Sequence, residues 1–184
     1  NEFINAKTRG IIGLKLHDGD NLISAVQTDG SSEIILVTRR GKALRFGEDS
    51  VRPMGRASAG IKGMKLSEGD EVTGAVIVTD DSTILLLTEK GYGKRVRFED
   101  FNPHGRGTSG QRIFGNTESR GEIIGLISVQ DSDEIVCMTS QGKTLRVLAK
   151  TINQQGTGST GVTVVKISEP DFLVGLDKVP DNKN

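Results

Sequence analysis

Basic residues recur at one place in a repeating pattern of this sequence, and side chains of this kind bind phosphate groups. The segments 42–46 (KALRF), 94–98 (KRVRF) and 143–147 (KTLRV) each end a run of β-forming residues, and each mixes apolar with basic side chains. Evenly spaced cations suit a polyanion, because each contact releases counterions and fixes a nucleic-acid strand without reading its bases. The pattern therefore predicts a track of phosphate contacts.

Period-two alternation places the apolar and basic side chains of these segments on opposite faces of a strand. In KALRF it separates Leu44 and Phe46 from Arg45, and in the other two segments it singles out Arg97 and Arg146. We expect these three arginines to occupy matching outward places. The full set of basic residues expected to contact the polyanion comprises Arg39, Arg40, Lys42, Arg45, Arg52, Arg56, Lys94, Arg95, Arg97, Arg106, Lys143, Arg146 and Lys150.

Duplex DNA fits this pattern better than a single strand does. Single-strand binding uses exposed aromatic side chains for stacking, and only 4% of this chain is aromatic. Glycine loops that permit close backbone approach and can form anion-binding nests recur beside the basic segments, as GRASAG (55–60), GRGTSG (105–110) and GTGSTG (156–161).

Two other interpretations stay open at this stage. Solvated lysine and arginine on strand edges also prevent edge-to-edge aggregation of β proteins. The acidic turns, which include Asp70 and Asp80, could form the contact surface of a propeller-type protein-interaction platform, or could reflect the turn propensity of Asp and Gly.

Catalytic and metal-binding motifs are not apparent. His17 and His104 lie far apart in turn contexts, and HDGDN (17–21) lacks the spacing of an EF-hand loop. GRASAGIK is not closed by the G-K-[ST] of a phosphate loop, and Cys137 lies in the apolar run IVCM. We expect no catalytic site, metal site or cofactor in this chain.

The elements that must position the basic residues repeat about every fifty residues. Each unit holds four short β segments separated by an acidic turn, a second polar turn and a glycine turn, which is typical of stacked β-meanders. The predicted fold is all-β and propeller-like, a single domain over 1–184 with repeats at approximately 10–60, 61–110 and 111–161 and a closing half-repeat at 162–180. Both ends fall inside a repeat, so we expect a partial ring, the alternative being strand exchange between neighbours.

Composition agrees with a soluble, cytoplasmic protein, and the expected binding of duplex DNA places it at the nucleoid. The 184 residues include one cysteine, and no stretch approaches the roughly 18 apolar residues of a membrane span. Formal net charge is zero, but acidic residues gather in the turns and basic residues in the last strand and loop of each unit.

The segments 39–66 (RRGKALRFGEDSVRPMGRASAGIKGMKL) and 89–110 (EKGYGKRVRFEDFNPHGRGTSG) resemble the C-terminal domain of the DNA gyrase A subunit. The related domain of topoisomerase IV is also similar. The resemblance extends over essentially the whole chain and implies a β-pinwheel, a propeller-like ring whose blades share strands. It implies wrapping of duplex DNA around a basic rim in support of ATP-dependent negative supercoiling. The partners it implies are the remaining domains of the A subunit, together with the ATPase-bearing B subunit.

One part of the family pattern is absent. The signature box Gln-Arg-Arg-Gly-Gly-Lys-Gly has no intact copy, since HGRGTSG matches it at Arg106, Gly107 and Gly110, and MGRASAG at Arg56 and Gly60. The resemblance therefore implies later blades of the ring.

Overall fold

The computed structural model describes residues 10–180, which form short β-strands joined by turns. The strands are β1 (Glu33–Thr38), β2 (Lys42–Gly47), β3 (Val72–Ile77), β4 (Thr83–Thr88), β5 (Tyr92–Arg97), β6 (Gln111–Arg112), β7 (Ile123–Val129), β8 (Glu134–Thr139), β9 (Thr144–Leu148), β10 (Val162–Thr163) and β11 (Leu173–Lys178). The helical pieces are the single turn α1 (Thr117–Arg120) and the 3-10 turns η1 (Glu48–Ser50), η2 (Phe98–Asp100) and η3 (Ala149–Thr151).

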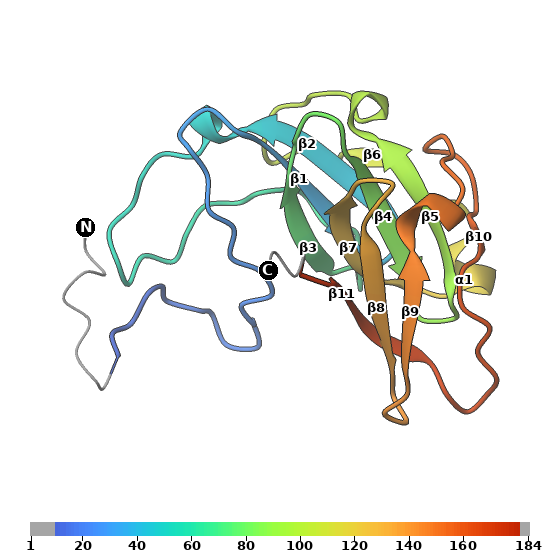
Figure 1. Cartoon of the computed structure of the whole chain (residues 1–184). Coiled ribbons are helices and arrows are strands. Elements are labelled where there is room, and N and C mark those ends of the chain that lie inside the picture. The colour runs from blue at the N-terminus through green and yellow to red at the C-terminus, as the bar shows by residue number, and fades with distance from the viewer. Residues whose placement is uncertain (1–9, 181–184) are drawn as a thin grey trace.

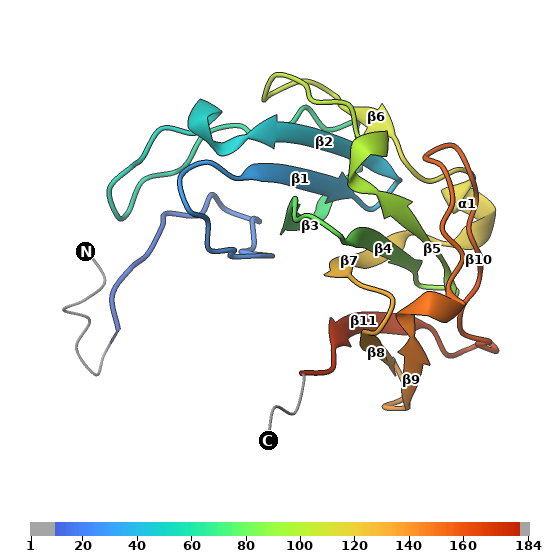
Figure 2. The same cartoon turned by 45° about the horizontal axis from the view of Figure 1, so that its top comes forward.

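Three antiparallel sheets follow one another along the chain (Figure 1). The first has the strand order β3-β1-β2-β6, the second β7-β4-β5-β10 and the third β11-β8-β9. Viewed as in Figure 2, they form an arc and do not close into a ring over the residues described. The all-β, propeller-like prediction is confirmed.

Each sheet is completed by strands from later repeats. In the first sheet, β3 pairs with β1 on the inside and β6 pairs with β2 on the outside, and the second sheet is built in the same way by β7 and β10. A repeat therefore cannot complete its own sheet. The outer edge of β9 carries no strand among the described residues, so the third sheet has three strands where four were expected.

The sequence predicted four β segments in each repeat. The structure contradicts this in the first two repeats, because it assigns residues 11–16, 22–28 and 61–66 to no strand. The reason lies in the sharing of strands. Segments equivalent to 22–28 are β3, β7 and β11, and each pairs with the central strand of the preceding sheet. Residues 22–28 have no such strand beside them in the described part of the chain, and Leu22 and Ile23 are exposed.

The hydrophobic core lies between successive sheets. One face of the first sheet, with Ile35 and Val37, packs against Ile84 and Leu86 of the second. The opposite face of the second sheet packs against the third in a separate cluster that includes buried Cys137. Since the second sheet is covered on both faces, β4 is a continuous apolar run and not an alternating one.

Glycines on the inner strands let neighbouring sheets approach closely. A Cβ on Gly74 would stand 2.6 Å from Leu126 Cδ2, and one on Gly125 would stand 2.2 Å from Leu176 Cδ2. Leu126 and Leu176 follow the corresponding glycine of their own strands by one residue. Each leucine thus fills the space beside the glycine of the equivalent inner strand in the preceding repeat.

Candidate nucleic-acid interface

The hairpins β1–β2, β4–β5 and β8–β9 set the positions of the basic side chains. In β2, Arg45 faces Ile35 across the hairpin, and the equivalent pairs are Arg95 with Leu85 and Arg146 with Val136. The expectation that Arg97 matches Arg45 and Arg146 is therefore wrong. Arg97 lies opposite Thr83 at the end of β5, two residues beyond the matching place.

Arg45 and Arg95 lie at the interfaces between successive sheets and do not face outward. The Arg45 guanidinium pairs with Glu33 and donates through Nη1 to the Phe98 carbonyl at 2.9 Å. Arg95 pairs with Asp131 and donates through Nε to the Ile152 carbonyl at 2.8 Å. The second face of each strand is covered by the next repeat, so these guanidinium groups do not lie on the outer rim.

Arg146 occupies the same place in the third sheet, where no further repeat covers it in the described part of the chain. Its side chain is 61% exposed and pairs with Glu134. Arg45, Arg95 and Arg146 thus occupy the same strand position, and the presence or absence of a covering repeat decides whether the side chain is buried.

Lys94 is also buried, and its ammonium group binds the third glycine loop from inside. Nζ lies 2.7 Å from the Gly156 carbonyl, 3.1 Å from the carbonyls of Thr157 and Ser159, and 5.3 Å from the centre of the Phe114 ring. Desolvation lowers the pKa of Lys94 to about 8. Neither Lys94 nor Arg95 can contact a polyanion in this geometry.

Four of the remaining candidates are at least partly exposed but face carboxylates. Such pairs weaken the attraction of a cation for phosphate, although contacts between exposed groups are readily exchanged. They are Arg39 with Glu71 and Glu122, Arg40 with Glu122, Arg97 with Asp100, and Lys143 with Asp171. The Asp100 carboxylate also raises the pKa of Arg97 through a hydrogen bond.

The outer edge of the first sheet collects cations that have no carboxylate partner within residues 10–180. Lys42 on β2 lies directly opposite Arg112 on β6, and the Lys42 ammonium donates to the Ser67 hydroxyl at 3.2 Å. Like charges directly opposite each other destabilise a sheet unless an anion lies between them. This edge is therefore suited to a phosphate.

Arg106 lies in the second glycine loop, which leads directly into β6. Its guanidinium donates to the carbonyls of Ser50 and Lys62, and the Gly107 amide donates to the Gly63 carbonyl at 2.6 Å. These bonds hold the loop against residues 62–65. Of the other candidates, Arg52, Arg56 and Lys150 are exposed.

Seven exposed cations among residues 10–180 escaped the sequence-based selection: Lys15, Lys62, Lys65, Lys90, Arg112, Lys166 and Lys178. A signal for three of them was present in the repeated segments 13–16 (GLKL), 63–66 (GMKL) and 164–167 (VVKI), which carry a lysine at the same place. The backbone amides of Lys15 and Lys65 donate to equivalent carbonyls, Ser58 at 3.0 Å and Thr108 at 2.8 Å.

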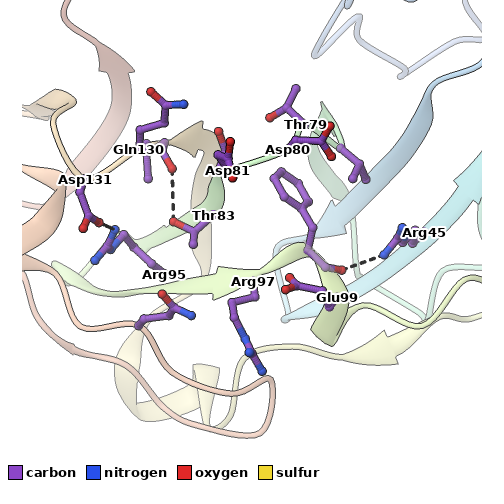
Figure 3. Close-up of a pocket in the computed structure, with 15 residues that line it drawn as sticks. Arg45, Thr79, Asp80, Asp81, Thr83, Arg95, Arg97, Glu99, Gln130 and Asp131 are labelled. Atoms are coloured by element: carbon purple, nitrogen blue, oxygen red, sulfur yellow. Dashed lines mark hydrogen bonds and ion pairs between the residues drawn. The ribbon is translucent and has the colours of Figure 1, made fainter.

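A cavity of about 820 Å³ opens between the turns of the three repeats (Figure 3). Arg45 and Arg95 line it, but so do the carboxylates of Asp80, Asp81 and Asp131, and Figure 3 shows Arg95 directed at Asp131. This mixed lining does not suit a polyanion. The other acidic residue considered for protein binding, Asp70, is buried and accepts a hydrogen bond from the Arg40 amide at 3.1 Å.

Groupings of His, Cys, Asp and Glu with the geometry of a metal site are absent from residues 10–180. Burial raises the pKa of the Cys137 thiol to about 11, which makes this residue unreactive near neutral pH. No helix in the described part of the chain is long and apolar enough to cross a membrane.

The family model "DNA gyrase C-terminal domain, beta-propeller" matches residues 1–29, 32–79, 82–130 and 133–180. This chain belongs to the DNA gyrase A C-terminal domain family. The DNA gyrase A subunit of Treponema pallidum is 64% identical over 177 residues, which are 96% of this chain and 22% of that protein. The Pseudomonas aeruginosa protein is 36% identical over 180 residues, 98% of this chain and 20% of that protein. The chain thus spans about a fifth of these relatives.

Solved structures of the gyrase family have the same fold. A DNA gyrase A C-terminal domain aligns with a TM-score of 0.86 and 30% identity, covering 92% of this chain and 58% of that one. The C-terminal domain of a DNA topoisomerase IV gives the same TM-score and identity and covers 92% of this chain and 53% of that one. The gyrase assignment therefore comes from the family model and the curated relatives, because the two folds are equally similar.

Proposed function

We propose that this chain binds duplex DNA along the outer edge of its sheets and helps to wrap it, as part of a DNA gyrase A subunit. The observation that carries the proposal is the cation pair of Lys42 and Arg112, opposite each other on an outer edge and without a carboxylate partner among residues 10–180. Together with Arg106, in the loop that leads into β6, they offer positive charge to a sugar-phosphate backbone.

The chain would act by positioning DNA and not by chemistry. Strand cleavage, strand passage and ATP hydrolysis would belong to the B subunit or to other domains of the A subunit, without a cofactor here, in the cytoplasm at the nucleoid. Curving a duplex of 20–30 bp by 40–90° costs about 1–6 kcal/mol, so several contacts must act together. The interface would therefore depend strongly on salt.

A salt titration tests the binding step. Affinity for a 30-bp duplex, measured by fluorescence anisotropy between about 50 and 200 mM salt, should fall with a log-log slope near −0.9 for each phosphate contacted. Replacing Lys42 and Arg112 together with glutamine should reduce this slope by about 1.8. An affinity that does not change with salt would reject the proposal.

Wrapping is tested separately on relaxed, nicked circular plasmid that is religated in the presence of the chain. A shift in linking number is the expected result and reports a wrapped path. Salt-dependent binding with no shift would mean that the chain attaches to DNA without wrapping it.

A further inference from the structure

The three glycine loops are each joined to the start of their own repeat by the same hydrogen bond. The amide of Lys15 donates to the Ser58 carbonyl, that of Lys65 to Thr108, and that of Gly115 to Ser159, at 3.0, 2.8 and 3.0 Å. The loops at 55–60, 105–110 and 156–161 thus share this contact and a left-handed glycine at their last place, so their side chains can be compared place by place. At the third place, Ala57 and Gly107 are left-handed and Gly158 is not.

Solvent-accessible cations accompany the first two loops and are missing from the third. Arg106, the second residue of its loop, corresponds to Arg56 in the first loop and to Thr157 in the third. The exposed lysine joined to the loop corresponds in the same way to Gly115. The first and second loops therefore each have both a lysine and an arginine, and the third loop has neither at these two positions.

The cation that contacts the third loop is the buried ammonium group of Lys94. Lys94 occupies the place that Leu44 takes beside the second loop, as their cross-strand partners Leu86 and Leu36 show. Its ammonium binds three carbonyls of the third loop, whereas Leu44 packs in an apolar cluster with Met64. A Cβ on Gly115 would stand 3.0 Å from the Gly158 carbonyl, so the third loop lies too close for a side chain there to fit without adjustment.

We propose that loops 55–60 and 105–110, each with its lysine and arginine, are two phosphodiester-binding sites, and that loop 156–161 is a structural loop held by Lys94. This inference rests on the proposed function, which it deepens. An arginine fork and a lysine point charge together hold one phosphate by hydrogen bonds and by charge. The DNA track is therefore interrupted at the third loop.

A gain of function tests the assignment. Thr157→Arg places on the third loop the arginine that the other two loops carry and leaves Lys94 in position. The salt slope for a 30-bp duplex should steepen by about 0.9 and the affinity at about 100 mM salt should rise severalfold. Ser132→Arg adds the same charge at an exposed turn away from the glycine loops, and it should leave the slope unchanged.

The corresponding loss-of-function variant is Lys65→Gln, which removes the lysine beside the second loop. Lys90→Gln is the control, because Lys90 is an exposed lysine in a hairpin turn. The first change should reduce the slope by about 0.9 and the second should not alter it. Equal effects of Thr157→Arg and Ser132→Arg, or of the two lysine changes, would overturn the inference, since net charge alone would then govern binding. If the unaltered chain binds no duplex even at low salt, the proposed function fails instead.

Discussion

Gly110→Ala is expected to lower the free energy of unfolding by about 3 kcal/mol. The cost has two sources, the left-handed backbone at this position and a steric clash at the packed interface between repeats. Gly110 has a φ of +65°, where a side chain is strained, and a Cβ there would stand 2.1 Å from the Ala43 carbonyl oxygen. That oxygen belongs to the backbone of β2, so no rotamer change can relieve the contact. Urea unfolding followed by circular dichroism would measure the loss.

Gly60→Ala provides the matched control. Gly60 ends the first glycine loop as Gly110 ends the second, and its φ of +79° is also left-handed, but a Cβ there would meet no atom within 4 Å. The expected cost is therefore about 1 kcal/mol, from the backbone conformation alone. Equal costs for the two variants would show that backbone conformation, and not the contact between repeats, requires these glycines.

Arg95→Ala is expected to destabilise the chain by about 2–4 kcal/mol, because it leaves the Ile152 carbonyl without its donor in a buried joint. Arg146→Ala removes the matching arginine from the third sheet. There the side chain is 61% exposed and, within residues 10–180, bonds Glu134 alone, so the expected cost is below about 1 kcal/mol. Thermal and urea unfolding of both variants give the comparison.

The same pair of variants separates stability from binding. Arg95→Ala should leave the salt slope of duplex binding unchanged at temperatures where the protein remains folded, because its guanidinium is buried between repeats. If Arg95→Ala bound DNA with a reduced slope while keeping its stability, Arg95 would be a DNA ligand and the joint assignment would be wrong.

Periodicity predicted the repeats and the all-β fold because apolar and turn residues recur at fixed intervals. It also separated Arg45 from Leu44 and Phe46, and the cross-strand pairs confirm this. What alternation could not show is the environment of the second face. In an isolated sheet that face meets solvent, but here the next repeat covers it, and the covering residues lie more than fifty positions away, as Phe98 does for Arg45.

The error at Arg97 has a simple origin. The three basic segments were matched by their apolar ends, whereas the register of each hairpin begins at its glycine turn. Counted from Gly41, Gly91 and Gly142, the fourth residue is an arginine in every repeat, namely Arg45, Arg95 and Arg146. The lysines beside the glycine loops were missed for another reason. The repeated segments place Lys15 and Lys65 at the same position, but only the amide contacts show that this position lies beside a glycine loop.

Lysine acetylation with and without saturating 30-bp duplex, read residue by residue by mass spectrometry, tests most directly whether DNA follows the outer edge. Lys42, Lys62 and Lys65 should be protected by DNA, Lys90 should react equally in both conditions, and Lys94 should react in neither because it is buried. Unchanged reactivity of Lys42, Lys62 and Lys65 in the saturated complex would contradict an interface on this edge.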